Sequence, residues 1–204
     1  PVTATPTITL YSNDTGASGD GITRDNALDL YGKTANSATV EIFDGGVSLG
    51  TVTADGAGNW HFLTGTLADG DHDFTVVATA PGGYGESDPS AVLSVTVDTT
   101  APAVPVITGF SDDTGYSSSD NQTFDNTLTF TGTADANVTI NIFRGGGLIA
   151  TTTADGNGDW SVTTDTLADG YASYEARAVD AAGNMSLPSS SMTIGIDTVA
   201  PAPP

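Results

Sequence analysis

Hydrophobic and polar residues alternate with a period of two along most of the chain. In "NTLTFTGTA", Leu128 and Phe130 alternate with threonine, and "TVEIFDGG" and "TINIFRGG" repeat the pattern around Val40 and Ile140. Gly, Asn, Asp or Pro interrupts the alternation about every 8 to 12 residues, which is the turn spacing of all-β domains. No stretch shows the 3.6-residue period of a helix. The pattern therefore predicts short β-strands and no helices.

The same series of predicted strands occurs twice. The inward-facing positions of the first series are Leu28/Leu30, Val40/Ile42, Trp60/Phe62, Phe74/Val76 and Leu93/Val95/Val97, and those of the second are Leu128/Phe130, Ile140/Ile142, Trp160/Val162, Tyr174/Ala176 and Met192/Ile194/Ile196. Thr, which is frequent between them, suits the solvent face of a strand better than a helix.

Longer phrases recur in the same order as the strands. "VDTTAP" at residues 97–102 returns as "IDTVAP" at 196–201, and "SNDTG", "TADGAGNW" and "TLADG" each have a counterpart in the second half. Such repetition predicts two domains, residues 1–100 and 101–204. Seven short strands in each favour an antiparallel sandwich. The predicted fold class is all-β: two tandem antiparallel immunoglobulin-like β-sandwiches joined by a short Pro-containing linker.

The charge balance limits the possible partners. The chain has 25 acidic and four basic residues, for a net charge of −21. This charge argues against nucleic acid and anionic lipid as partners, and no apolar run is long enough to span a membrane. The absence of Cys and the presence of only two His residues leave few ligands for zinc or copper. Because the chain begins with Pro1 and ends in "PAPP", we expect it to be part of a longer protein.

Strand order predicts where the acidic loops lie. A chain crosses a sandwich from one end to the other with every strand, so the loops after the first, third and fifth strands share the end where the chain leaves. Asp14 and Asp20 are then expected near Asp98, and the linker brings the opposite end of the second copy toward them. The candidate metal ligands are the loop residues at these ends: Asp14, Asp20, Asp98, Asp113, Asp120, Asp135, Asp180, Asn184 and Asp197.

Calcium is the ion that suits such a group. Gathered carboxylates repel one another, and Ca²⁺ accepts six to eight oxygen ligands in loose geometry, whereas Mg²⁺ requires a tight octahedron. The chain has no EF-hand loop, so the predicted site is built from loops and linkers. The alternative for any single residue, such as Asp69 or Asp165, is that it caps a turn.

These motifs together resemble a known family. "DDTG", "ADGxGxW", "LADG", "AVDAAGNMS" and "DT-x-AP" are similar to the bacterial Ig-like tandem repeats of giant type I-secreted adhesins, including RTX and biofilm-associated adhesins. The resemblance implies calcium-stiffened stalk modules of a secreted, cell-surface protein that serves cell adhesion and biofilm formation. It also implies that the partners are neighbouring modules of a monomeric chain, and that another part of the parent binds the host or surface ligand. The first copy departs from the pattern, because Ala80 replaces Asp180 and no residue matches Asn184, unless Glu86 or Asp88 substitutes.

Two functional classes compete in this interpretation. The first is a structural extender with calcium at module junctions, and the second is a ligand-binding module, for which a carbohydrate is the candidate ligand. Aromatic residues that could contact a sugar are Tyr11, Tyr31, Phe43, Tyr84, Tyr116 and Phe143, of which Tyr84 and Tyr116 lie in predicted loops. Phe43 and Phe143 recur in both copies, which suggests a structural role. An enzyme is not expected, because the sequence shows no catalytic triad, phosphate loop or repeated acid pair.

Overall fold

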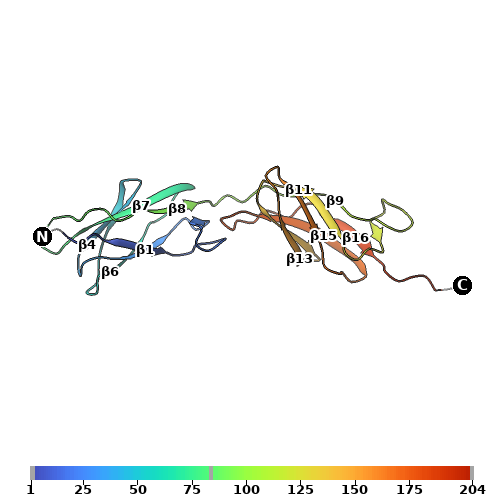
Figure 1. The fold of residues 1–204 in the computed structure, drawn as a ribbon, viewed down its shortest axis with the longest axis horizontal. Coiled ribbons are helices and arrows are strands. Elements are labelled where there is room, and N and C mark those ends of the chain that lie inside the picture. Colours follow the sequence, from blue (N-terminus) through green and yellow to red (C-terminus); the bar gives the residue numbers. More distant parts are fainter. Residues whose placement is uncertain (1–2, 83–84, 203–204) are drawn as a thin grey trace. The chain divides into compact units, whose positions relative to one another are not determined.

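The computed structural model describes residues 3–82 and 85–202. It divides into two compact units, the first formed by Pro1–Thr100 with Ala181–Gly183 and the second by Ala101–Asp180 with Asn184–Pro204. We call residues 1–100 module 1 and residues 101–204 module 2. Every regular element in the described residues is a β-strand (Figure 1).

Each module is a sandwich of a three-stranded and a five-stranded sheet. In module 1 the first sheet has the order β1 (Thr7–Tyr11), β3 (Asp29–Lys33), β6 (Asn59–Leu63), and the second β2 (Ile22–Thr23), β8 (Leu93–Val97), β7 (Gly70–Thr79), β4 (Thr39–Asp44), β5 (Val47–Thr53). In module 2 the orders are β9 (Val106–Phe110), β11 (Thr129–Thr133), β14 (Asp159–Thr163), and β10 (Gln122–Thr123), β16 (Met192–Ile196), β15 (Gly170–Val179), β12 (Thr139–Arg144), β13 (Gly147–Thr153).

The alternating apolar positions form the two cores, as predicted. Leu30, Ile42 and Phe74 are fully buried in module 1, and Phe130 and Tyr174 are fully buried in module 2. Phe62 and Val162 are only partly buried, at the margin of each core. The all-β fold class with two immunoglobulin-like sandwiches is therefore confirmed.

One feature of the sheets differs from the prediction. Each module has an additional two-residue strand, and this strand runs parallel to the last strand of its module: β2 beside β8 and β10 beside β16. The sequence prediction of seven purely antiparallel strands missed them. Two residues are too few to show an alternation, and their position depends on the long loop after the first strand lying against the sheet.

One position in each module must be glycine, because a neighbouring backbone carbonyl and a tryptophan ring leave no space for a side chain. A Cβ atom on Gly32 would lie 1.9 Å from the carbonyl oxygen of Thr7 and 2.3 Å from the ring of Trp60. Gly132 would meet Val106 and Trp160 at 2.0 and 2.2 Å. The "GTA"/"GKT" segments therefore carry a packing requirement that hydrophobic periodicity does not reveal.

The chain enters and leaves each sandwich at opposite ends. In module 1, Thr7 at the start of β1 pairs with Lys33, whereas Val97 at the end of β8 pairs with Gly70. Strands β9 and β16 repeat this arrangement in module 2. We call the two ends the N-terminal end and the C-terminal end of a module. The loops at the C-terminal end of module 1 are residues 12–21, 45–46 and 64–69, and those at the N-terminal end are residues 34–38, 54–58, 80–82 and 85–92.

Candidate cation and linker sites

The C-terminal end of module 1 brings two of its three predicted ligands to one pocket. Asp14 and Asp20 both line a pocket of about 460 Å³ beside Tyr11. The Tyr11 hydroxyl donates a 2.9 Å hydrogen bond to Asp14 Oδ1, and the Gly19 amide donates to the other oxygen. Burial, followed by this hydrogen bond and the charges of Asp14 and Asp20, raises the pKa of Tyr11 to about 12. The phenol therefore remains a donor to the carboxylate at any physiological pH.

Asp98 holds the start of the linker. Its amide donates to Thr23 O at 2.8 Å, which continues the β2–β8 pairing, and its Oδ1 accepts the Thr100 amide at 3.0 Å. Asp20 Oδ1 similarly accepts the Ile22 amide at 2.9 Å. These are turn-capping contacts, which aspartate side chains make readily.

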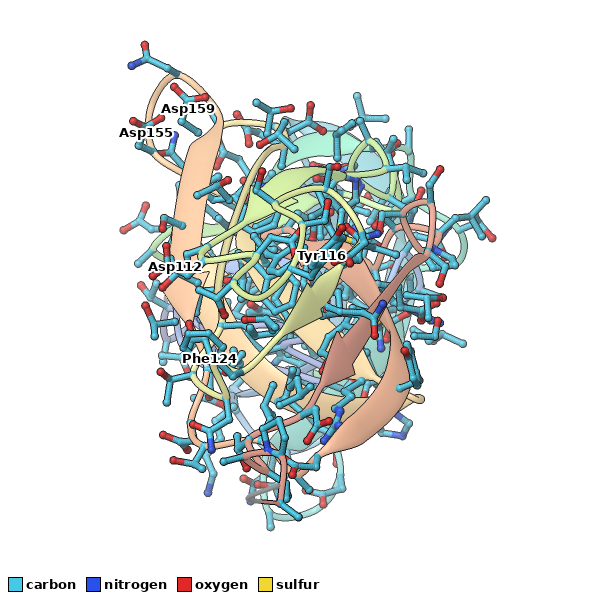
Figure 2. All side chains as sticks on the ribbon, turned by 90° about the vertical axis from the view of Figure 1, so that its right-hand side faces the viewer. Asp112, Tyr116, Phe124, Asp155 and Asp159 are labelled. Atoms are coloured by element: carbon cyan, nitrogen blue, oxygen red, sulfur yellow. The ribbon has the colours of Figure 1, made fainter. Side chains whose placement is uncertain are left out.

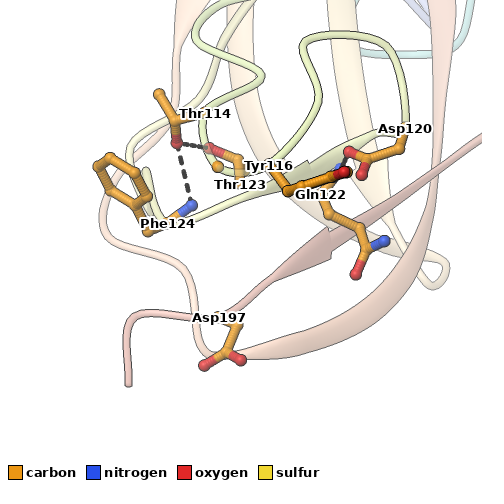
Figure 3. A pocket seen from close by; sticks show the side chains of 8 residues that line it. Thr114, Tyr116, Asp120, Gln122, Thr123, Phe124 and Asp197 are labelled. Atoms are coloured by element: carbon orange, nitrogen blue, oxygen red, sulfur yellow. Dashed lines mark hydrogen bonds between the residues drawn. The ribbon is translucent and has the colours of Figure 1, made fainter. Parts of the chain in front are cut away.

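The corresponding end of module 2 has a pocket lined by a different pair of predicted ligands. Asp120 and Asp197 line a shallow pocket of about 210 Å³ together with Tyr116, Gln122 and Phe124 (Figure 3). Asp120 Oδ1 accepts the Gln122 amide at 3.1 Å, and Asp197 Oδ1 accepts the Val199 amide at 3.0 Å, so this end repeats the turn caps of module 1.

Asp113, the counterpart of Asp14, is incompletely satisfied. Its Oδ2 accepts the Asn121 amide at 3.2 Å, but its Oδ1 is buried and accepts no hydrogen bond from the described residues. The reason is a substitution in the preceding strand, where Phe110 stands at the place of Tyr11 and has no hydroxyl to donate.

The N-terminal end of module 2 places three predicted ligands in two loops. Asp180 accepts both the backbone and side-chain amides of Asn184, at 2.8 and 3.0 Å, so these two residues form one closed turn. Asp135 instead accepts the Ala103 amide of the linker at 2.7 Å. Asp155, in the turn that connects β13 in one sheet to β14 in the other, accepts the Asp159 amide at 3.0 Å, and Figure 2 shows the two residues side by side at this turn.

The metal assignments remain predictions. In residues 3–82 and 85–202, no three acidic or histidine side chains come close enough together to hold a metal ion. Within single modules the structure places Asp14 near Asp20, Asp120 near Asp197, and Asp180 near Asn184.

Of the loop aromatics, Tyr116 is fully exposed, and Tyr84 lies outside the described residues.

The linker contacts identify a residue that sequence reasoning had treated as a simple turn cap. Asp69 accepts hydrogen bonds from the Thr99 hydroxyl at 2.7 Å and amide at 3.1 Å, and from the Thr100 hydroxyl at 3.0 Å. These hydrogen bonds lower the pKa of Asp69. In module 2, Asp169 accepts the Thr198 hydroxyl at 3.0 Å. The repetition of both "LADG" and "DT-x-AP" marks these two segments in the sequence. It does not show that they contact each other, because they are about 30 residues apart.

Known proteins resemble this chain over its whole length. Exoglucanase B of Cellulomonas fimi is 29% identical over 221 aligned residues, which cover 99% of this chain and 19% of that protein. The chain thus spans about a fifth of this curated relative. No helix in the described residues is long and apolar enough to cross a membrane.

A solved structure of fibronectin(III)-like modules supports the fold. The fibronectin(III)-like modules of Clostridium thermocellum CbhA match with a TM-score of 0.56 and 16% identity, over 92% of this chain and 94% of theirs. The BSP domain of a biofilm-associated protein matches with a TM-score of 0.36 and 16% identity, over 94% of this chain and 30% of its own. A family model for the bacterial Ig-like domain matches residues 2–99 and again residues 100–198, so the chain belongs to the bacterial Ig-like domain family and carries two tandem copies of that domain.

Proposed function

We propose that the two modules are spacers within a large extracellular bacterial protein. The observation that carries this proposal is the opposite placement of the two termini in each sandwich, at Thr7 and Val97 in module 1. A module of this kind adds its full strand length to the chain, at about 3.3 Å per residue of strand. Bacterial Ig-like and fibronectin(III)-like modules are in general non-catalytic, which agrees with a spacer role.

The secured linker supports the same role. Eight residues, 98–105, separate β8 from β9. Module 1 binds Thr99 and Thr100 through Asp69, and module 2 binds Ala103 through Asp135. Between these attachments lie Ala101 and Pro102, and the ring of Pro102 restricts its own backbone. A short and restrained linker limits bending between consecutive spacers.

Calcium at the module junction is the second part of the proposal. Its support is the chemistry of the loops at the module ends, which offer carboxylate and amide oxygens and almost no nitrogen or sulfur ligands. Asp14 and Asp20 at one pocket, and the unsatisfied buried oxygen of Asp113, are places where a cation would relieve repulsion or a missing hydrogen bond. In this proposal Asp14, Asp20 and Asp98 of one module contribute ligands together with Asp135, Asp180 and Asn184 of the next.

A calcium titration tests this part. Calcium is expected to raise the melting temperature and saturate in the range of about 10⁻⁴ to 10⁻³ M typical of extracellular modules. It is also expected to lengthen the maximum dimension measured by small-angle scattering. Asp98→Asn should abolish both responses. Asp165→Asn is the matched control and should behave as wild type, because the Asp165 carboxylate accepts no hydrogen bond from residues 3–82 and 85–202. Identical melting and scattering in chelator and in calcium would exclude the calcium junction and leave the spacer role in place.

Two kinds of parent protein are compatible with a spacer. The sequence resemblance favours a surface adhesin with roles in cell adhesion and biofilm formation, whereas the name of the Cellulomonas fimi relative favours an exoglucanase. In both, the modules separate other domains outside the cell. The sequence of the parent chain distinguishes them, since a catalytic domain in it would exclude the adhesin.

A further inference from the structure

The C-terminal end of module 2 exposes three aromatic side chains. Tyr116 is fully exposed, Phe124 is 62% exposed and Tyr171 is 71% exposed. Tyr116 and Phe124 line the 210 Å³ pocket, and both are on the face turned toward the viewer in Figure 2. Such a concentration of exposed rings on a chain with 7% aromatic residues calls for an explanation other than folding.

Module 1 shows that the fold does not require these rings. Ala17, Arg24 and Asp71 occupy the corresponding positions, and module 1 forms the same sandwich. Asp71 there accepts the hydroxyl of Thr96 at 2.7 Å, which is an ordinary cross-strand contact. The aromatic residues are therefore additions to a common framework.

The pocket is ordered by contacts within module 2. The ring of Tyr171 lies over Gly195, where a Cβ atom would come within 2.6 Å of it, and its hydroxyl donates to Gln122 Oε1 at 2.7 Å. Because the amide oxygen of Gln122 is engaged, its NH₂ group is left to donate to another partner. The Phe124 amide donates to Thr114 Oγ1 at 3.1 Å, which fixes the backbone beneath the phenyl ring.

Carboxylates complete the wall of the pocket. In Figure 3, Phe124 and Asp120 stand on opposite sides of it and Asp197 lies below them, directly after the end of β16. The Oδ1 atoms of Asp120 and Asp197 cap their own turns, and their Oδ2 atoms accept no hydrogen bond from the described residues. The pocket thus combines exposed rings, two carboxylate acceptors and one amide donor.

The geometry points to a saccharide site at this pocket, formed by Tyr116 and Phe124 with Asp120, Gln122 and Asp197. A pyranose ring has apolar C–H faces that stack on aromatic rings, and hydroxyl groups that both donate and accept hydrogen bonds. Its hydroxyls would donate to the carboxylates and accept from Gln122. A neutral, linear β-1,4-linked saccharide is the ligand class proposed, because its flat faces recur along the chain and can meet two separated rings.

Charge and hydrogen-bonding capacity separate this ligand from two others. Anionic ligands are disfavoured by Asp120, Asp197 and the net charge of −21. An organic cation would be attracted by the rings and carboxylates, but it has no use for the amide donor of Gln122, and the open pocket would not desolvate it. The saccharide uses all three kinds of group.

The test is a titration of the two-module chain with cellohexaose, followed by ¹H–¹⁵N NMR. Shifts are expected at the amides of Gly115, Gln122 and Phe124, and none at the corresponding residues of module 1. Tyr116→Ala and Phe124→Arg introduce the residues of module 1 at positions where that module folds. Each should weaken binding by about tenfold, the factor that corresponds to ~1.4 kcal/mol. Tyr31→Thr, which replaces an exposed tyrosine of module 1 by its counterpart in module 2, is the matched control and should bind as wild type.

Several outcomes would overturn the assignment. Absence of shifts with cellohexaose and with chitohexaose would exclude the saccharide class. Larger shifts with tetramethylammonium than with either saccharide would identify a cation site. Shifts at these amides on raising the protein concentration alone would show that the patch binds a second copy of the chain. The indole signal of Trp160 reports in every variant whether module 2 is folded. All titrations are made in excess chelator, because Asp120 and Asp197 are also predicted metal ligands, so the outcomes are independent of calcium and of the spacer role.

Discussion

The two modules have equivalent cores, but different side chains bind the same backbone carbonyl, that of Ala68 in module 1 and Ala168 in module 2. In module 1, His72 bridges the Ala68 carbonyl, 2.9 Å from Nε2, and Asp44, 2.6 Å from Nδ1. In module 2, Ala172 replaces the histidine, and Arg144, at the place of Asp44, donates to the Ala168 carbonyl at 2.7 Å. A side-chain nitrogen meets the same carbonyl in both, but only histidine is a residue type whose ordinary pKa lies near neutral pH. The same fold therefore accepts either a histidine, which titrates with pH, or an arginine, which does not, as the partner of this carbonyl.

The largest expected effect concerns what the modules share. Gly32→Ala and Gly132→Ala should each destabilise their own module by at least about 3 kcal/mol, because the added methyl overlaps a backbone carbonyl and a tryptophan ring. Denaturation followed by the Trp60 and Trp160 indole NMR signals reports each module separately. Gly56→Ala, where a Cβ meets nothing within 4 Å, is the control and should have a small effect. A large difference between the two core variants would mean that the cores are not equivalent.

The second largest expected effect is a pH dependence of folding stability that is present in module 1 and absent in module 2. Burial alone lowers the pKa of His72, but the Ala68 carbonyl and the carboxylates of Asp44 and Asp71 together raise it above its ordinary value. A raised folded-state pKa means that the stabilisation is complete below about 6.5, the ordinary histidine pKa, and is lost as pH rises through the folded-state pKa. Module 1 should therefore lose stability as pH rises from 6 to 9, and module 2 should not.

Substitution checks the origin of this pH dependence. His72→Ala should cost module 1 about 1 to 2 kcal/mol at pH 6 and less at pH 9, because it removes hydrogen bonds made by a charged group. The double substitution Asp44→Arg with His72→Ala copies module 2 and should flatten the pH profile. Equal pH profiles of the two wild-type modules would contradict the prediction.

A smaller effect is expected at the first strand. Phe110→Tyr supplies the hydroxyl that Asp113 Oδ1 lacks, and should stabilise module 2 by about 1 kcal/mol. Tyr11→Phe removes the corresponding hydrogen bond to Asp14 and should destabilise module 1 by a similar amount. Urea denaturation measures both. If Phe110→Tyr is neutral while Tyr11→Phe is destabilising, the Asp113 oxygen has another partner in solution.

The smallest effect on stability is expected at the linker. Asp69→Ala should leave the core intact and increase the picosecond-to-nanosecond mobility of the Thr99 and Thr100 amides, as measured by ¹⁵N relaxation. Because the pKa of Asp69 is lowered, this ordering is present above the ordinary aspartate pKa and is lost as pH falls through the folded-state pKa. Asp169→Ala, which removes a contact to Thr198 alone, should have a weaker local effect. Unchanged relaxation in Asp69→Ala would show that the linker is held by other contacts.

Periodicity predicted the sheets well because each strand has one buried face. Val40 and Ile42 are fully buried, as their alternation with polar residues indicated, and Trp60 and Trp160 belong to the cores. The two-residue strands β2 and β10 were missed, because their pairing depends on a long loop and not on a local pattern. The exclusion of side chains at Gly32 was missed for a similar reason, since it arises from contacts between distant strands.

Placement of the acidic loops was predicted better than their chemistry. Asp14 and Asp20 share a pocket as strand order suggested, yet Asp69, interpreted as a turn residue, holds the linker. Among the aromatics, Tyr116 was a candidate, whereas Phe124 and Tyr171 were not. Comparison of the two copies would have revealed them, since Arg24 and Asp71 are their counterparts and are not aromatic.

The opposite placement of the termini has a mechanical consequence for each sandwich. Tension applied along the chain pulls β1 toward one end of a module and β8 toward the other, parallel to the strands. The backbone hydrogen bonds of the β1–β3 and β7–β8 pairs are perpendicular to that direction, so they are loaded together in shear and are not peeled apart one by one. The short parallel strand β2, bonded to the last residues of β8, joins the same set of bonds at the point where the load enters. Each bacterial Ig-like module is thereby arranged to resist being stretched.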